Sequence, residues 1–563
     1  MVILGLTHTA SWNPAACLIV DGKLVWFAEE ERFTRIKHAP NAFPENAIDF
    51  GLKNSGLNIN DIDFVSIGFG KAVSALLLSP AIFKPLYDKL WNHLKQLGIK
   101  EDKVRFYNHH VSHIASTFPC SGYSSTNILS IDGSGEDCSG ILGVYSDFFS
   151  DFYSAELINK KSTFKNIIIP ATHSWGELWS DVTEILGFYR HSGEGKTMGL
   201  APYGSYDESV LPAFLNSDGC PDNKRYKQFF KDKGYQVKRV YQEQPGVSLE
   251  PLSEEGKNTA YTLQSLYNDF LLKTASVLSK SSGLNDFSIT GGCGLNCSGN
   301  GFLAQQGFVN NIFIQPASHD AGTALGSAVL AHWDITGKPI DTVFDHAYWG
   351  SEYSTDYVRK TLIKHNIIYE EVNPSKAAAR LLENNYIIGF FQGRAEVGPR
   401  ALGNRSILAN PCHIENLEKV NQIKGRESWR PLSPSILADD YFNIVDTEVI
   451  SPFMLLALPV AKDWINKIPA VVHVDGSCRP QTVLQETNPV YYNLIKEFKV
   501  LTDTPVVLNT SFNLSHEPIV NSPDDALSTF FNSNLDALII DKFLIIQDNN
   551  KGKIIPNRRM DVN

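Results

Sequence analysis

Cysteines are few in this sequence, and long apolar runs are missing. Its eight cysteines include no CxxC pair, which argues against a thiolate metal site and against a disulfide framework. The opening residues, MVILGLTHTA, place no basic segment before their apolar run, so a secretory signal is not expected. We therefore expect a cytoplasmic protein with reduced thiols. Apolar runs such as FMLLALPVA fall far short of the ~20 residues that a membrane span requires, so no membrane partner is expected.

Basic residues are outnumbered by acidic ones. The 50 Lys and Arg residues against 61 Asp and Glu residues give a formal net charge of −11 and a pI near 5.8. A broad nucleic-acid surface needs basic patches that attract phosphate, so a nucleic-acid partner is not expected. Any anion that the protein binds must be held by a local cluster. With 563 residues, 43% of them hydrophobic, the chain is long enough for about two to four domains.

Two stretches of the chain predict similar strand and turn patterns. Residues 1–31 contain an apolar strand, a loop of small residues, a second strand, an Asp-Gly turn and a third strand. Residues 127–146, NILSIDGSGEDCSGILGVYS, again run from an apolar strand into an Asp-Gly turn. This recurrence resembles the paired β-meander halves of the actin, sugar-kinase and heat-shock ATPase class. Together with the helical spacing of residues 259–280, it predicts an α/β fold.

A change of pattern near residues 340–355 predicts a domain boundary. One helix should end near Thr336, and a connection with Pro and Asp leads to a new helix and strand in AAARLLENNYIIGFFQG. We therefore expect one domain over residues 1–345 and a second over residues 355–563.

The segment NHHVSH suggests a metal site. His109 and His113 are four residues apart, so on a helix both imidazoles would project from one face, about one turn apart. A zinc-protease motif would need glutamate after the first histidine, where this chain has His110. Asp132 and Asp320 could complete a nitrogen and oxygen site suited to Fe(II), Mn(II) or Zn(II). The alternative, histidines that are solvated or bonded to backbone carbonyls, stays open at this point.

Three glycine-containing loops could bind phosphate: SIDGSGE (130–136), TGGCGLNCSGNG (290–301) and PASHDAGTALGSA (316–328). Glycine lets backbone N–H groups approach phosphate oxygens without side-chain obstruction. Taken singly, such glycines more often mark structural turns. All three loops, in this order after the histidine segment, form a more specific pattern. They predict nucleotide or adenylate contacts at Gly133, Gly135, Gly291, Gly292 and Asn296.

Basic residues gather in the C-terminal part of this acidic chain, at Arg394, Arg400, Arg405, Lys424, Arg426, Arg430 and Arg479. Guanidinium groups bind phosphate or carboxylate through paired hydrogen bonds, so a small dianion is the expected ligand. Taken one at a time, Arg405 and Arg426 are expected to be solvated on helix faces. Four other basic residues lie beside proline or within apolar, strand-like sequence, so we expect their side chains to line a cleft. They are Arg400, Lys424, Arg430 and Arg479.

The motifs together resemble one family, the ATP-dependent O-carbamoyltransferases that modify antibiotics and nodulation factors. The match runs in order from about residue 1 to about residue 525, through EEERFTRIKH, NHHVSH, DGSGE, GEGKTMGLAPYG, GGCGLN, DAGTALG, GPRALGNRSILA, RPLSPSIL, HVDGSCRPQTV and LNTSFN. The resemblance implies an N-terminal domain similar to the tRNA threonylcarbamoyl-transferase. It implies a C-terminal domain similar to threonylcarbamoyl-AMP synthase.

The resemblance also implies a reaction in two steps. The C-terminal domain would form carbamoyl-adenylate from carbamoyl phosphate and ATP, with Mg2+, and the N-terminal domain would transfer the carbamoyl group to a hydroxyl of a small natural product. The implied metal ligands are His109, His113, Asp132 and Asp320. Among the ions that suit these ligands, we expect Fe2+ in preference to Mn2+ or Zn2+. The implied carbamoyl phosphate and ATP ligands are Arg400, Lys424, Arg430, Arg479 and Asn509. The implied catalytic residues are His109, Asp132, Arg430 and Arg479. A homodimer is one open oligomeric state.

Two departures from the family pattern stand out. Many relatives have His-Asp in the first loop, as a candidate base for the acceptor hydroxyl, where this chain has Trp12 and Asn13. His8 could substitute, although we interpret it as a loop histidine. His516 replaces a glycine that is usual in relatives. Two other functions remain to be weighed, a small-molecule kinase of the sugar-kinase class and a nucleotide-gated scaffold similar to heat-shock ATPases.

Overall fold

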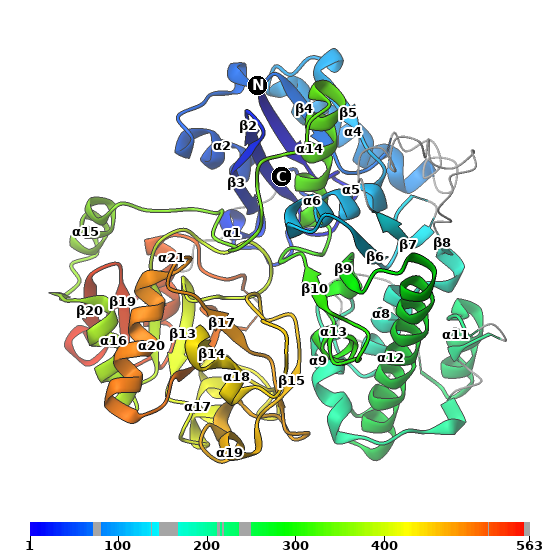
Figure 1. Cartoon of the computed structure of the whole chain (residues 1–563). Helices are drawn as coiled ribbons and strands as arrows, with labels where there is room; N and C mark the ends of the chain where they lie inside the picture. The colour runs from blue at the N-terminus through cyan, green and yellow to red at the C-terminus, as the bar shows by residue number, and fades with distance from the viewer. Residues whose placement is uncertain are drawn as a thin grey trace.

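Three large sheets and the helices around them make up the part of the chain that the structure describes (Figure 1). This computed structural model describes residues 1–70, 80–136, 138–145, 167–210, 214–216, 219–235, 249–515 and 517–556. The side chains of residues 80–83, 223 and 224 are not included. The mixture of strands and helices confirms the α/β class expected from the sequence.

The first sheet combines an antiparallel meander with two parallel strands. Its strands, in order across the sheet, are β3 (Lys23–Glu29), β2 (Ala15–Val20), β1 (Val2–Leu6), β4 (Phe64–Ile67) and β5 (Val104–Phe106). Strand β1 is antiparallel to β2 and parallel to β4. Asp21 and Gly22 form the turn between β2 and β3 with φ values of 49° and 82°, as an Asp-Gly hairpin turn requires. The pattern predicted for residues 1–31 is confirmed.

The second sheet repeats this topology. Its strands, in order, are β8 (Ile167–Pro170), β7 (Cys138–Tyr145), β6 (Thr126–Ile131), β9 (Asp286–Thr290) and β10 (Asn311–Ile314). Strand β6 is antiparallel to β7 and parallel to β9, as β1 is to β2 and β4. The two halves therefore share one meander-plus-parallel arrangement, which confirms the pairing predicted from the recurring strand and turn pattern.

Helices of the N-terminal half are α1 (Glu31–Thr34), α2 (Glu45–Asn54), α4 (Pro80–Gln96), α5 (His109–Ala115), α6 (Phe118–Ser121), α8 (Trp175–Ile185), α9 (Glu194–Leu200), α11 (Asn223–Asp232), α12 (Glu254–Ser282), α13 (Cys297–Ala304) and α14 (Ala321–Thr336). Helix α12 begins after Ser253, whose side chain accepts a hydrogen bond from Gly256 N, and ends before Gly283 with φ 71°. It contains the predicted helix at 259–280 and extends beyond it at both ends.

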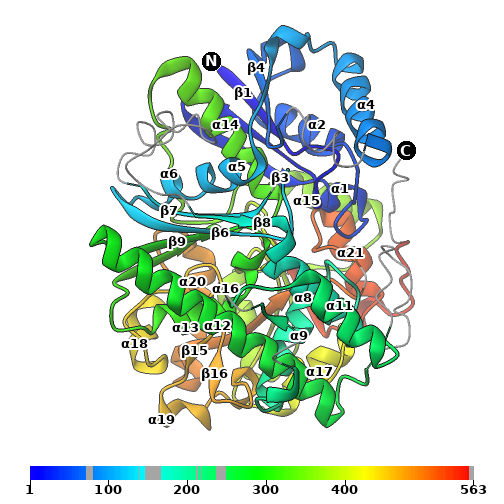
Figure 2. The same ribbon diagram turned by 90° about the vertical axis from the view of Figure 1, so that its right-hand side faces the viewer.

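Helices α5 and α14 pack against each other between the two N-terminal sheets (Figure 2). Glycines permit this close approach. A side-chain carbon at Gly326 of α14 would lie only 1.7 Å from Ser112 O of α5, and one at Gly5 of β1 would lie 2.2 Å from Ala324 O of α14. The packing brings the histidines of α5 near the first turn of α14.

The third sheet lies in the C-terminal half. Its strands, in order, are β11 (Glu370–Glu371), β20 (Phe543–Ile546), β19 (Ala537–Ile540), β12 (Ile388–Phe391), β13 (Arg405–Ala409), β18 (Val506–Ser511), β14 (Ser433–Leu437) and β17 (Gln481–Val483). Helices α16 (Pro374–Glu383) and α20 (Pro489–Thr502) pack together, and Leu382 and Phe498 join Phe390 of β12 in one buried cluster. The remaining elements are α15 (Thr355–Lys364), α17 (Glu415–Ile423), α18 (Tyr441–Ile444), α19 (Lys462–Ile465), α21 (Pro523–Phe531) and the strand pair β15 (Leu458–Pro459) and β16 (Ser477–Cys478).

Buried arginines of α1 and of the residue after it join the two halves. Arg35 donates to Ile519 O at 2.6 Å and to Pro518 O at 2.9 Å, and Arg32 donates to Gly398 O at 2.6 Å. The connection from α14 to α15 has neither helix nor strand. The division into residues 1–345 and 355–563 stays a prediction.

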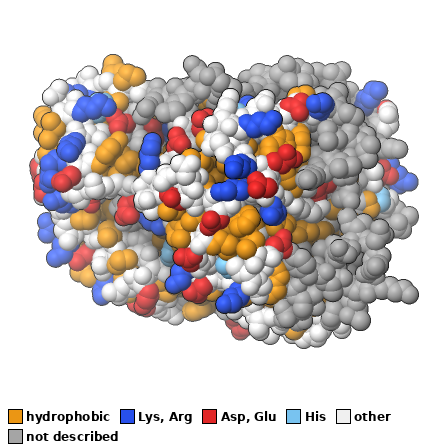
Figure 3. Space-filling model, turned by 90° about the horizontal axis from the view of Figure 1, so that it is seen from above, with side chains coloured by type: hydrophobic (Ala, Val, Ile, Leu, Met, Phe, Trp, Pro, Cys, Tyr) orange, Lys and Arg blue, Asp and Glu red, His pale blue; other side chains and the backbone are white. Residues whose placement is uncertain are grey.

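The outer surface mixes charges. On the face drawn in Figure 3, Lys and Arg side chains are interspersed with Asp and Glu side chains. No helix within the described part of the chain has both the length and the apolar character needed to cross a membrane.

Candidate active site

The start of helix α5 is fixed by two side chains. Asn108 caps the helix, since its side chain accepts a hydrogen bond from Val111 N at 3.1 Å. The Glu136 carboxylate accepts hydrogen bonds from His109 N at 3.2 Å and from the Asn108 side chain and Gly70 N. The glutamate that ends the DGSGE motif therefore positions the histidine-bearing helix.

The three histidines of α5 have two different environments. His109 and His113 are 1% and 0% exposed, and their Nε2 atoms lie 3.1 Å apart. His110 points elsewhere and donates from Nε2 to Cys138 O at 2.9 Å. Burial lowers the pKa of His110 to about 3, so its ring is neutral. The interpretation of a histidine bonded to a backbone carbonyl therefore applies to His110 and not to the other two.

Asp132 follows strand β6 and faces both imidazoles. Its Oδ2 lies 3.3 Å from His109 Nε2 and 3.0 Å from His113 Nε2. Its Oδ1 accepts hydrogen bonds from Gly133 N at 2.7 Å and Gly292 N at 3.1 Å. The two glycine-containing loops of the second sheet thus hold this carboxylate in place.

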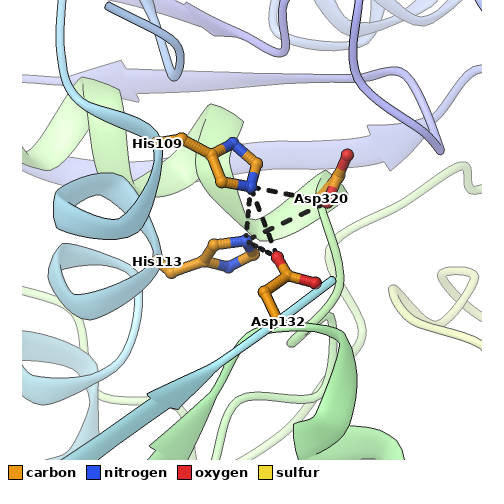
Figure 4. A group of neighbouring side chains, drawn as sticks. All are labelled: His109, His113, Asp132 and Asp320. Carbon is orange, nitrogen blue, oxygen red and sulfur yellow. Dashed lines mark hydrogen bonds and ion pairs between the residues drawn. The ribbon is translucent and has the colours of Figure 1, made fainter. Parts of the chain in front are cut away.

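Asp320 approaches the same point from the start of α14 (Figure 4). Its Oδ1 lies 3.7 Å from His109 Nε2 and 4.0 Å from His113 Nε2, and its Oδ2 accepts a hydrogen bond from Trp12 N at 2.7 Å. Together with Asp132, these residues place two imidazole nitrogens and two carboxylate oxygens within 4.8 Å of one another. Such a donor set could hold a divalent metal ion with a nitrogen and oxygen preference.

Protonation within the cluster follows from burial and charge. Burial alone would lower the pKa of His109, but its hydrogen bond to Asp132 and the charge of Asp320 raise that pKa to about 9. Burial prevails at His113 and lowers its pKa. Against the opposing effect of burial, hydrogen bonds from both imidazoles keep the pKa of Asp132 well below its usual range. The cluster therefore holds its carboxylate ionised, as a metal ligand must be.

The predicted anion ligands meet on the wall of one large cavity of about 950 Å³. This basic wall consists of Arg400, Lys424, Arg426, Arg430 and Arg479. The buried Lys424 Nζ donates to Ser511 O and, at 2.9 Å, to Asn513 O. Asn509, also predicted, lines the cavity and donates from Nδ2 to Ser435 Oγ at 3.0 Å. Four of the five cations of the wall are those for which the sequence predicted anion binding, and that binding stays a prediction.

The basic wall is short of negative partners. Arg400 Nε is buried and has no hydrogen-bond partner among the described residues. Burial, followed by the charge of Arg479, lowers the pKa of Arg400 to about 9. Burial and the neighbouring cations also lower the pKa values of Lys424 and Arg426. A bound anion would relieve this repulsion and satisfy the unpaired guanidinium N–H.

The metal-ligand cluster opens into the same cavity as the basic wall. Asp132 and Asp320 line it at one side, with Gly133, Gly292 and Asn296. Gly135 and Gly291 do not line it. A side-chain carbon at Gly135 would lie 2.5 Å from His110 Nε2, and one at Gly291 would lie 2.3 Å from Ile131 O, so close packing accounts for both glycines.

Two of the arginines differ from the expectation. Arg405 is fully buried in β13, over the Phe391 ring at 3.6 Å, so the solvated helix residue predicted there is wrong. Arg426 was also expected to be solvated, but it lines the cavity and donates to Thr510 Oγ1 at 2.9 Å. Arg394 donates to three backbone carbonyls, Val25 O at 2.9 Å, Trp349 O at 2.6 Å and Gly350 O at 3.2 Å, and lies outside the basic wall.

The loop that departs from the family pattern lies at the cavity. Trp12 and Asn13 line it, whereas His8 does not. His8 is 1% exposed and accepts a hydrogen bond from Ala10 N at 2.9 Å, as a structural loop histidine does. His516 lies outside the described residues. Sequence reasoning also missed Lys37 and His38, two further lining residues from the EEERFTRIKH motif.

Comparison with known proteins gives a consistent result. Two family profiles match: the one described as Carbamoyltransferase N-terminus over residues 66–329, and the one described as Carbamoyltransferase C-terminus over residues 379–547. Nodulation protein NolNO of Sinorhizobium fredii is 34% identical over 574 residues, which cover 96% of this chain and 80% of its own. The 3'-hydroxymethylcephem-O-carbamoyltransferase of Amycolatopsis lactamdurans is 34% identical over 246 residues, 42% of this chain and 44% of its own. Among solved structures, HypF of T. kodakarensis aligns with a TM-score of 0.35 at 13% identity, over 59% of this chain and 48% of its own.

Proposed function

Because the chain belongs to the carbamoyltransferase family, we propose that it is an ATP-dependent O-carbamoyltransferase. It forms carbamoyl-adenylate from carbamoyl phosphate and ATP and transfers the carbamoyl group to a hydroxyl of a small natural product. The observation that carries this proposal is the shared cavity, which is lined by the basic wall and by the two carboxylates of the histidine and carboxylate cluster. The name of the cephem relative supports a hydroxyl on a small molecule as the acceptor.

Adenylate formation takes place at the basic wall. Carbamoyl phosphate and ATP are both polyanions, and Arg400, Lys424, Arg430 and Arg479 are placed to neutralise and orient them, with Asn509 beside them. The unpartnered Nε of Arg400 is available to a phosphate oxygen. Water hydrolyses carbamoyl phosphate to carbamate and phosphate. A carbamate oxygen then bonds to the α-phosphorus of ATP as pyrophosphate leaves, which gives carbamoyl-adenylate. Guanidinium groups stabilise the charge that develops on both departing groups.

Carbamoyl transfer takes place at the cluster of His109, His113, Asp132 and Asp320. The four side chains present suitable donors for Fe2+, Mn2+ or Zn2+, and Fe2+ is the ion to test first. Bound there, such an ion would supply Lewis-acid stabilisation of the departing AMP phosphate. The chain's own residues hold the ligands in place, since Gly133 N and Gly292 N fix Asp132 and Trp12 N fixes Asp320. The adenylate passes between the two sites within the shared cavity.

The proposal is tested by measuring pyrophosphate release and by screening acceptors. Purified protein with ATP and Mg2+ should release pyrophosphate only when carbamoyl phosphate is present. A panel of hydroxylated metabolites, including aminoglycosides, macrolactams and lipo-oligosaccharides, is then examined by mass spectrometry for the gain of one carbamoyl group. ADP formation with a phosphorylated product would identify a small-molecule kinase instead. Nucleotide binding without any product would favour the scaffold alternative.

A further inference from the structure

Four non-glycine residues with left-handed backbone conformations line the cavity. They are Asn13, His38, His191 and Met454, with φ values of 58°, 64°, 59° and 56°. Only a few per cent of non-glycine residues adopt this region, and asparagine and histidine do so more often than most. Strained backbone of this kind persists where the surrounding structure holds it, and it is concentrated at functional sites. His38 and Asn13 are also in direct contact.

Both ring nitrogens of His38 are held by polar side chains. Nδ1 lies 2.8 Å from Asn13 Nδ2, and Nε2 lies 3.1 Å from Ser192 Oγ. The His38 backbone N donates to Glu31 Oε2 at 2.6 Å, which fixes the segment that carries the ring. The imidazole therefore has a defined orientation, with Nε2 directed at a hydroxyl group.

Each of the other imidazoles of the cavity has one ring nitrogen in a hydrogen bond with a backbone group or an arginine, and His319 Nε2 lies 3.8 Å from Glu29 Oε1. His319 Nδ1 accepts a hydrogen bond from a backbone N–H at 3.2 Å, and His473 Nε2 donates to a backbone carbonyl at 3.0 Å. His191 Nε2 accepts a hydrogen bond from Arg190 Nε at 3.2 Å. At His38 the Nε2 partner is a serine hydroxyl, which an acceptor hydroxyl can replace. An amide at Nδ1 can serve either neutral tautomer, because Nδ2 donates and Oδ1 accepts.

We propose that His38 is the catalytic base of the acceptor step and that Asn13 is its positioning residue. This inference rests on the proposed function and adds a residue to it. As the acceptor oxygen bonds to the carbamoyl carbon, its proton moves to His38 Nε2. The bond from that carbon to the phosphate oxygen breaks, and AMP leaves with the bonding electron pair. In the base form, Nδ1–H donates to Asn13 Oδ1, after the amide has turned from the orientation seen here.

The surroundings of His38 keep the ring neutral at neutral pH, so it carries no second proton before the transfer. Burial lowers the pKa of His38 to about 4, against the charge of Glu31, which raises it. The other titratable or charged groups that act on the ring lower its pKa further, and these are Lys37, His191 and His319. A proton taken by His38 is therefore readily released after the transfer.

Two small nucleophiles test the assignment without knowledge of the natural acceptor. With ATP and carbamoyl phosphate, wild-type protein should form methyl carbamate from methanol and hydroxyurea from hydroxylamine, each above the enzyme-free rate. Hydroxylamine attacks through a free lone pair and needs no base, whereas methanol does. His38→Gln keeps an amide near the Nε2 position, so we expect it to lose methyl carbamate formation about 100-fold or more. It should retain hydroxyurea formation and pyrophosphate release within about threefold.

Two further variants separate this role from a structural one. His8→Asn replaces the alternative base and should leave both products unchanged, because the asparagine oxygen can still accept the Ala10 N–H. Asn13→Asp adds a carboxylate at Nδ1, which raises the His38 pKa and should shift the acidic limb of the methanol pH profile upward. Equal decline of both products in His38→Gln, or loss of methyl carbamate in His8→Asn, overturns the assignment. Wild-type protein that releases no pyrophosphate and forms neither product overturns the proposed function itself.

Discussion

The Nε2 atom of His113 lies 3.0 Å from Oδ2 of Asp132, although the two residues belong to different parts of the fold. The histidine is on α5, and the aspartate follows β6 of the second sheet. Two glycine N–H groups hold the carboxylate, and the packing of α5 against α14 adds Asp320. The cluster is therefore a product of tertiary packing, and none of its four residues belongs to the basic wall.

His109→Ala should separate the two half-reactions. Removal of one imidazole leaves three donors, so bound metal and carbamoyl transfer should both be lost. Pyrophosphate release that depends on carbamoyl phosphate should persist, because the basic wall is unchanged. Metal analysis and the two activity measurements decide this, with His365→Ala, a histidine of the α15 end paired with Asp524, as the control. Unchanged metal content and transfer in His109→Ala would show that the cluster is no metal site.

The bound metal is expected to be Fe2+. Two imidazoles and two carboxylates offer no thiolate, which leaves Fe2+, Mn2+ and Zn2+ as suitable ions. Protein purified without oxygen should contain about one iron per chain by elemental analysis, and exposure to air should lower transfer more than pyrophosphate release. Stoichiometric zinc in fully active protein would rule out iron as the required ion.

Local patterns predicted the elements of this fold well. Alternation of apolar segments and Asp-Gly turns was sufficient for the first meander, because Asp21 and Gly22 need only their own backbone freedom to form the turn. Spacing of four residues predicted that His109 and His113 share a helix face. The same reasoning failed for Arg405, because its burial depends on carbonyls and on the Phe391 ring, which come from other segments.

Contacts between distant segments limit how much of the candidate site can be predicted from the sequence. The contact of Asn13 with His38 joins two loops 25 residues apart in the chain, and Ser192 follows 154 residues later. No periodicity in the sequence predicts contacts between these loops. Gly135 and Gly133 look alike in sequence, yet Gly135 packs on His110 and Gly133 lines the cavity. The side to which a loop turns is decided by its neighbours in space.

Stability should fall between pH 6.5 and pH 4 partly because of His8. Burial lowers the pKa of His8 from 6.5 to about 4, so in this range the unfolded chain binds a proton that the folded protein does not. Above pH 6.5 His8 is neutral in both states and does not lower the free energy of unfolding. As the pH falls to 4, protonation of His8 in the unfolded chain lowers the free energy of unfolding by ~3 kcal/mol. His8→Asn should therefore lose less thermal stability than wild type between pH 7 and pH 4. Parallel melting-temperature curves for the two proteins would contradict this.

Arg400 should bind phosphate at a cost to the stability of the ligand-free protein. Its buried Nε has no hydrogen-bond partner among the described residues, and the charge of Arg479 acts against its own, so Arg400→Met should melt at the same temperature as wild type or higher. Inorganic phosphate should raise the melting temperature of wild type and much less that of Arg400→Met. In the control Arg359→Met, which removes an exposed pair with Glu371, the phosphate effect should be retained. An equal phosphate effect in all three proteins would place the anion elsewhere.

Arg430 and Arg479 should act only in adenylate formation. Both precede proline, which disfavours a helical backbone at the arginine. Arg479 donates from Nε and Nη2 to Ser433 Oγ at 3.1 and 3.0 Å. These bonds hold its guanidinium group at the cavity wall, which both residues line. Loss of either side chain should cost about 1.5–3 kcal/mol for each charge-assisted contact, roughly 10- to 150-fold in kcat/KM for carbamoyl phosphate.

Lysine at either position should restore activity only in part, because a point charge cannot reproduce two parallel hydrogen bonds. Supplied with preformed carbamoyl-adenylate, Arg430→Ala and Arg479→Ala should transfer the carbamoyl group at nearly the wild-type rate, since the metal-ligand cluster is intact. A purely structural role would instead reduce both half-reactions together with the melting temperature. A variant that melts normally and fails equally with carbamoyl phosphate and with preformed adenylate would show that the two half-reactions do not occupy separate ends of the cavity.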